Sequence, residues 1–253
     1  MRLWALVRNT FREAVRDKVL LTLLVIAFLV TAGARLIPSL AAGEEVKIIK
    51  DLGLKSMTLF CVLIAVLVGG RLVYREIEKR TIFVILAKPV ARWQFVLGKY
   101  LGLMLVLVTS VAIMTAWFAL FMTLSRIPVQ PQMLLQVLLL VFELAVITAI
   151  AVLFSTFVTP ISSAVFTFAI YFTGSLSRSL LYWGTKDRPV LVQAVSRFCY
   201  YLLPNLQNFD ISGSVVHNVP VNYAQVGLTV VYALVYVSAV LLIATLVFRR
   251  RNF

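Results

Sequence analysis

The sequence predicts an all-α integral membrane protein of six transmembrane helices. Three observations support this: the composition, the length of the uncharged runs and the placement of the basic residues. Hydrophobic residues make up 62% of the chain and charged residues 13%, whereas a soluble domain is about 45–50% apolar and about 25% charged. Because a backbone in lipid must satisfy its own hydrogen bonds, about 20 apolar residues in a helix are needed to cross the hydrocarbon core.

Uncharged runs of this length recur along the whole chain. The longest, from Ile127 to Ser177, contains one charge, Glu143, and is long enough for two crossings. We expect it to break at Thr159-Pro160, because proline lacks the N–H that a continuing helix needs. The expected spans, all within a single membrane domain of residues 1–253, are 19–37, 56–74, 100–124, 133–157, 161–183 and 224–248.

Basic residues gather in three stretches of the chain. Of the 24 Lys and Arg residues, five lie in 1–18, seven in 71–99 and three in 249–251. Lys and Arg near span ends accumulate on the cytoplasmic side, so we expect both termini and the 71–99 loop in the cytoplasm. Topology and anionic lipid then account for the net charge of +14, and no nucleic-acid partner is expected.

Residues 1–18 are expected to form an amphipathic elbow helix in the membrane interface. Apolar side chains recur there at three- and four-residue spacing, while Arg8, Arg12 and Arg16 form a stripe on another face. The alternative is a signal peptide. The apolar run that follows is longer than the core of an ordinary signal peptide, which favours retention of the segment.

Two loops are expected on the outer side of the membrane. The first, residues 38–55, carries the mixed charges of GEEVKIIKD and is expected to be solvated. The second, residues 184–222, contains an apolar and aromatic piece from Val190 to Leu206. For this piece we expect short helices that dip into the outer interface.

Catalytic and metal-binding patterns are nearly absent from the sequence. His217, the only histidine, lies within the eight-residue segment 210–217 together with one aspartate and two serines, whereas a hydrolase triad brings together residues from separate elements. Gly98-Lys99-Tyr100 lacks the leading glycine and the Ser or Thr of a phosphate-binding loop. We therefore predict no catalytic residues, no metal site and no ATP hydrolysis by this chain itself.

Glu143 is the carboxylate that the sequence places at mid-bilayer. Such a residue costs about 2.5–3.5 kcal/mol on insertion scales and indicates a functional site by default. Glu143 either lines a translocation pathway or bonds to serine or threonine hydroxyls of a neighbouring helix. The sequence leaves both interpretations open.

The segment between the second and third spans contains, in order, two acidic residues, Thr-Ile, Pro-Val, a basic residue and Gly-Lys. This pattern resembles that of a known family, the six-span permease subunits of type 2 ATP-binding cassette (ABC-2) exporters. The serine-rich turn after span four also fits, and LPNLQNFD (203–210) is similar to the branch that includes permeases of nitrous-oxide-reductase maturation and gliding systems. One departure is Arg80, where a small residue commonly precedes the threonine. The matching residues are Glu76, Glu78, Thr81, Ile82, Pro89, Val90, Arg92, Gly98 and Lys99.

This resemblance implies the partners and the mechanism. Two permease chains, expected as a homodimer among the lipids of the bacterial cytoplasmic (inner) membrane, would assemble with two copies of an ABC ATPase subunit. ATP and Mg would bind to the ATPase, and this chain would need no cofactor. A cytoplasmic coupling helix in the region 75–92 would pass the closure of the ATPases to the spans. The residues that the resemblance assigns to coupling are Arg75, Glu76, Glu78, Arg80, Thr81, Ile82, Pro89, Val90 and Arg92.

A self-sufficient carrier or channel is the competing class of protein. Carriers usually place several ionisable or helix-breaking features in related halves, whereas here Glu143 is the obvious mid-span acid and no internal repeat is visible. An intramembrane hydrolase lacks a suitable base. The substrate stays open among lipids, drugs, peptides and maturation factors, as do a heterodimer of permeases and a further periplasmic partner.

The predicted orientation is testable by cysteine labelling in a background that lacks Cys61 and Cys199. A cysteine at Ala87 should react with an impermeant thiol reagent only from the cytoplasmic side, and one at Gly184 only from outside, because the basic loop holds 71–99 in the cytoplasm. The reverse pattern of labelling would show that the orientation is wrong.

Overall fold

A computed structural model of the chain describes residues 2–33, 45–72, 91–177, 203–217 and 219–250, with a few isolated positions between 191 and 200. Every regular element in these ranges is a helix. The elements are α1 (Arg2–Val15), α2 (Lys18–Gly33), α3 (Glu45–Leu72), α6 (Arg92–Leu124), α7 (Pro131–Ser155), α8 (Pro160–Ser175), the 3₁₀ helix η2 (Leu206–Phe209), α11 (Ser212–His217) and α12 (Tyr223–Arg250).

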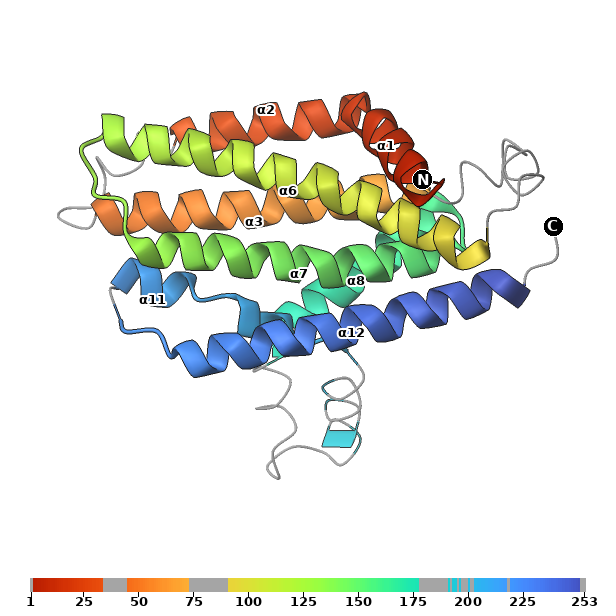
Figure 1. Ribbon diagram of the computed structural model, residues 1–253. Coiled ribbons are helices and arrows are strands. Elements are labelled where there is room, and N and C mark those ends of the chain that lie inside the picture. The colour runs from red at the N-terminus through yellow and green to blue at the C-terminus, as the bar shows by residue number, and fades with distance from the viewer. Residues whose placement is uncertain are drawn as a thin grey trace.

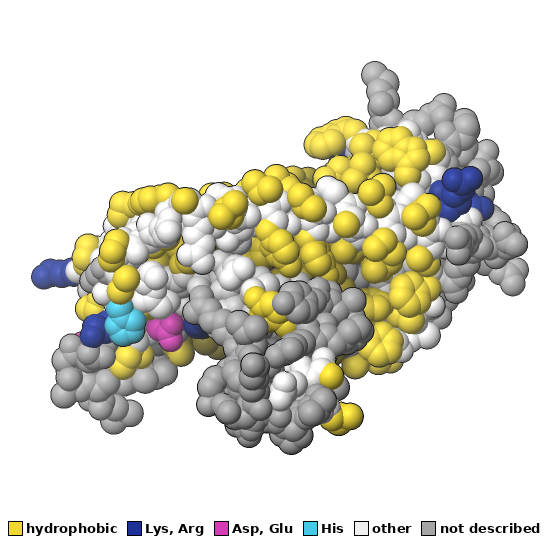
Figure 2. All heavy atoms as spheres, turned by 90° about the horizontal axis from the view of Figure 1, so that it is seen from below, with side chains coloured by type: hydrophobic (Ala, Val, Ile, Leu, Met, Phe, Trp, Pro, Cys, Tyr) yellow, Lys and Arg dark blue, Asp and Glu magenta, His cyan; other side chains and the backbone are white. Residues whose placement is uncertain are grey.

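The long helices form a bundle suited to a membrane. Helices α3, α6, α7 and α12 are long and apolar enough to cross a bilayer, while α2 and α8 have 16 residues each. In Figure 1, α2, α3, α6, α7 and α12 lie side by side along a common direction, with α1 and the last turn of α12 at one end and α11 at the other. Figure 2 shows hydrophobic side chains across the middle of one face and charged side chains near its two ends. The chain is therefore an all-helical integral membrane protein.

Helix α7 lies at the centre of this bundle. It contacts α3, α6, α8 and α12 along its length, and η2 and α11 near its start. All seven residues from Val146 to Val152 are buried, which means that neighbours surround this part of the helix on every side. The polar side chains of α7 consequently face other helices rather than lipid.

The 51-residue run does break near Thr159-Pro160. Helix α7 ends at Ser155, and α8 begins at Pro160 with Thr159 before it in an extended conformation, at φ −65° and ψ 159°. Proline suits the first position of a helix because its missing N–H would have no partner there. The chain thereby turns from α7 into α8 within five residues.

The expectation of a solvated outer loop over residues 38–55 is wrong for its second half. Helix α3 begins at Glu45, so the charged residues 45–55 form its first three turns. Ile49 and Lys50 are buried, and α11 packs against α3. The sequence analysis treated mixed charge as a sign of a loop, whereas these charges belong to a helix that another element partly covers.

Helix α6 likewise begins earlier than expected, at Arg92 instead of residue 100. Its first turns pack against α1, and this contact depends on two glycines. A methyl group at Gly98 would lie 2.9 Å from Leu6 Cβ, and one at Gly102 would lie 2.5 Å from Thr10 Cβ. Small residues thus allow the two helices to approach closely, as is typical of helix contacts in membranes. The interfacial position expected for α1 stays a prediction.

Of the outer piece expected over residues 190–206, the structure describes residues 203–206 and a few isolated positions. The elements η2 and α11, in residues 206–217, fold back over the ends of α7 and α3. These two short helices therefore pack on the bundle itself.

Helix propensity alone predicts that replacing glycine by alanine stabilises a helix. The close contact between α1 and α6 predicts the opposite at Gly102. Gly102→Ala should lower the thermal stability of the detergent-solubilised protein, since overpacking typically costs about 1–3 kcal/mol. Gly227→Ala on α12 is the matched control, because a methyl group there would have no neighbour within 4 Å; it should be neutral or stabilising. Equal midpoints for the two variants in thermal unfolding would contradict the proposed packing of α1.

Candidate functional site

Most residues assigned to coupling, from Arg75 to Val90, lie outside the described residues. Arg92 is described, and it binds within the chain. Its guanidinium donates hydrogen bonds to the carbonyl oxygens of Phe248, at 3.1 Å, and Arg249, at 2.7 Å. The last carbonyls of a helix have no partner in that helix, so Arg92 caps the end of α12. Phe95 also stacks on Phe248, with ring centroids 5.4 Å apart.

Ion pairs join α1 and its following turn to both sides of the coupling region. At the end of α3, the Arg71 guanidinium lies 3.9 Å from the Asp17 carboxylate. At the start of α6, the Lys99 ammonium lies 3.7 Å from the Glu13 carboxylate, with the Lys99 side chain 1% exposed. Asp17 also accepts the Val19 N–H at 2.9 Å. The Gly98-Lys99 pair of the family pattern therefore serves the docking of α1 on α6.

Glu143 lies deep in the bundle on the central helix α7, with 4% of its surface exposed. It lines a cavity of about 390 Å³ between α3, α7, α8 and η2. Among the described residues, no hydrogen bond or ion pair reaches its carboxylate. The same cavity wall contains the hydroxyl groups of Thr58, Tyr171 and Ser175, so the role of Glu143 in a translocation pathway stays a prediction.

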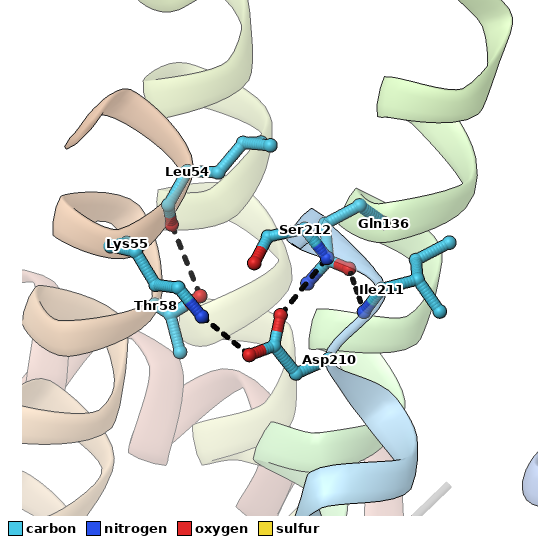
Figure 3. Close-up of polar contacts among 7 residues, drawn as sticks. All are labelled: Leu54, Lys55, Thr58, Gln136, Asp210, Ile211 and Ser212. Atoms are coloured by element: carbon cyan, nitrogen blue, oxygen red, sulfur yellow. Dashed lines mark hydrogen bonds and ion pairs between the residues drawn. The ribbon is translucent and has the colours of Figure 1, made fainter. Parts of the chain in front are cut away.

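Polar contacts lie at one end of this cavity (Figure 3). Lys55 on α3 forms a hydrogen-bonded ion pair with Asp210, which follows η2. Asp210 also accepts the Ser212 backbone N–H at 3.0 Å, and Gln136 on α7 accepts the Ile211 N–H at 2.8 Å. These contacts fix the turn between η2 and α11 against both α3 and α7.

The charge of Asp210 depends on these neighbours. Partial burial raises the pKa of this carboxyl, but the hydrogen bonds from Lys55 and Ser212 together with the charge of Lys55 outweigh it, so the pKa lies below its ordinary value. Asp210 is therefore ionised at neutral pH and balances the charge of Lys55.

A second group of contacts continues from this turn toward α12. Ser177 donates a hydrogen bond of 2.6 Å to the Asn205 side chain, and the Asn205 backbone N–H donates to the Tyr232 hydroxyl at 3.1 Å. The 203–210 stretch thus connects the end of α8 to α7, α3 and α12 through its polar groups.

Sequence reasoning missed the joint role of Lys55, Gln136 and Asp210. It considered Asp210 only with His217 in the segment 210–217, yet Asp210 pairs with Lys55, 155 positions away. His217 is exposed at the end of α11 and lines other pockets. The sequence did contain one indication of this pair, because both Lys55 and Asp210 lie at the predicted outer edge of the membrane.

In the described part of the chain, no three His, Cys, Asp or Glu side chains lie together as a metal site would require. The geometry defines a helical membrane protein with a polar cavity between its spans. The sequence matches the family described as ABC-2 family transporter protein over residues 4–252. The chain therefore belongs to the ABC-2 transporter family, whose members are generally non-catalytic membrane subunits. No curated protein matches the sequence significantly.

The Lys55–Asp210 pair predicts a pH dependence of stability. Because the pKa of Asp210 is lower in the folded protein, the pair stabilises the fold above the ordinary Asp value of about 3.9 and loses this effect as the pH falls through the folded-state value. Asp210→Asn should therefore lower the unfolding midpoint at pH 7, and its difference from the wild type should shrink as the pH falls below the ordinary Asp value.

A double-mutant cycle with Lys55→Met isolates the pair in the same thermal measurement. Both side chains are partly exposed, at 50% and 39%, so a coupling free energy of roughly 0.2–1 kcal/mol is expected at pH 7. Additive effects of the two substitutions at pH 7 would show that the pair does not stabilise the fold.

Proposed function

We infer that this chain is the permease subunit of an ABC exporter and works as a homodimer with two ATPase subunits. The family match over residues 4–252 carries this proposal. ATP and Mg bind to the ATPase, and the six spans, counting α2 and α8, form the translocation pathway. The substrate leaves toward the outer side of the membrane.

The distribution of charge supports the orientation. Four basic residues, Arg71, Arg92, Lys99 and Arg249, lie at the end of the bundle that carries α1. Lys and Arg near span ends favour the cytoplasmic side. Both termini accordingly face the cytoplasm of a bacterial cell whose inner membrane holds the protein.

The contacts of α1 support a route for mechanical coupling. Segment 73–90 connects the end of α3 to the start of α6, and ion pairs of Arg71 and Lys99 attach both of these helices to α1 or its turn. A push from the ATPase on the coupling helix therefore moves α3 and α6 together with α1. Because α3 contributes to the wall around Glu143, this movement changes the shape of the cavity on the proposed pathway.

The test is reversal of charge on the coupling segment, with Glu76→Lys and Glu78→Lys combined. Charged groups at an interface chiefly set orientation and specificity, and truncating a desolvated charged partner costs roughly 2–5 kcal/mol. We expect normal insertion but weaker co-purification of the ATPase and loss of substrate-stimulated ATP hydrolysis in reconstituted membranes.

Glu45→Lys is the matched control, since it reverses one exposed charge at the opposite end of α3. It should leave ATPase association unchanged. If the Glu76→Lys, Glu78→Lys variant behaves as this control does in both assays, the segment is only a topological marker and the proposed coupling is wrong.

A further inference from the structure

The cavity around Glu143 is polar at both its inner and outer ends. Gln136 and Glu143 lie on the same side of α7, seven residues apart, which is about 10 Å along a helix. Lys55 and Asp210 line the same cavity beside Gln136. The buried carboxylate is therefore about two helical turns inward from the ion pair.

The charges in the cavity wall do not balance. Lys55 and Asp210 neutralise each other through their ion pair, and Glu143 is the one other carboxyl or amino side chain among the described residues of the cavity wall. Gln136 accepts the Ile211 N–H through its side-chain oxygen, and it lies seven residues from Glu143, about 10 Å along α7. A carboxylate away from water is costly unless a cation or a hydrogen-bond donor reaches it. A cationic ligand would supply the partner that an ionised Glu143 needs at this position.

The remaining lining residues restrict the kind of cation. A metal ion prefers several oxygen, nitrogen or sulfur ligands at short range, whereas no such group of acidic, His or Cys side chains occurs among the described residues. The cavity, about 390 Å³, is also far larger than the roughly 30 Å³ that one water molecule occupies in the liquid. It is wide enough for an organic group.

Apolar and aromatic surface lies beside the carboxylate. Leu59 on α3 and Leu206 in η2 line the cavity, together with the Tyr171 ring on α8. An aromatic face attracts an ammonium ion, particularly where water is excluded, and leucine side chains suit the carbon substituents of such an ion. Ser175 adds a hydroxyl group at the same wall.

The geometry points to a binding site for a monovalent organic ammonium group, with Glu143 as its counter-charge and the Lys55–Asp210 pair at the entrance. The ammonium group belongs either to a water-soluble amine or to the head group of a lipid. Identification of this ligand as the transported substrate rests on the proposed function, whereas binding itself does not.

Binding to the purified full-length chain tests the site, with two probes that separate the sources. Butyltrimethylammonium is titrated calorimetrically in maltoside micelles, and native mass spectrometry compares retention of phosphatidylethanolamine with that of phosphatidylglycerol. Saturable binding of the first probe indicates a soluble amine, and preferential retention of phosphatidylethanolamine indicates a lipid head group. Absence of both results overturns the inference.

Glu143→Gln keeps the size of the side chain and removes its charge. It should weaken binding of the active probe by about tenfold or more, which corresponds to about 1.4 kcal/mol. Asp51→Asn is the matched control, since it removes an exposed carboxylate from the same protein outside this cavity. Wild-type affinity in the Glu143→Gln variant would overturn the assignment of Glu143.

A second variant covers the case in which Glu143→Gln does not fold. Thr58→Phe adds volume to the cavity wall on α3 and leaves Glu143 in place, so it should abolish binding of either probe. Unchanged binding in Thr58→Phe would place the ligand elsewhere. Co-purification of the ATPase subunit with the wild-type chain is measured in parallel. If the complex forms but the wild-type chain binds neither probe, the ammonium site is wrong while the proposed function stands.

Discussion

The arrangement of the protein depends on the enclosure of α7 by other helices. In lipid, an apolar helix gains little by leaving one hydrocarbon surface for another, so close packing and polar contacts hold the bundle together. The buried run from Val146 to Val152 shows how complete this packing is. Because α3, α6, α8 and α12 all contact α7, a change in any one of them reaches the same central element.

Charged side chains act at the two ends of the bundle in different ways. At the end that carries α1, Arg71 and Lys99 meet carboxylates of α1 and its turn, and Arg92 meets the last carbonyls of α12. These contacts join segments far apart in the sequence. At the other end, Lys55 and Asp210 hold the turn after η2 over the cavity. The basic residues are therefore structural as well as topological.

Glu143 differs from these charged residues because its carboxylate has no partner among the described residues. A carboxyl group at this depth costs stability that a leucine would not. The wall around it combines one aromatic ring, hydroxyl groups and leucine side chains, which is the mixture that ligand sites commonly present. The fold itself does not require this carboxylate, whereas the proposed ligand binding gives it a role.

The sequence by itself determined the class of the protein, the presence of long apolar helices and the break at Pro160, because length, hydropathy and proline chemistry act locally along the chain. It also placed Glu143 within a span. Only the tertiary structure decided that residues 45–55 belong to a helix, that Gly98 and Gly102 admit α1, and that Asp210 meets Lys55. These features depend on contacts between segments distant in sequence, and no local pattern of charge or hydropathy specifies which segments meet.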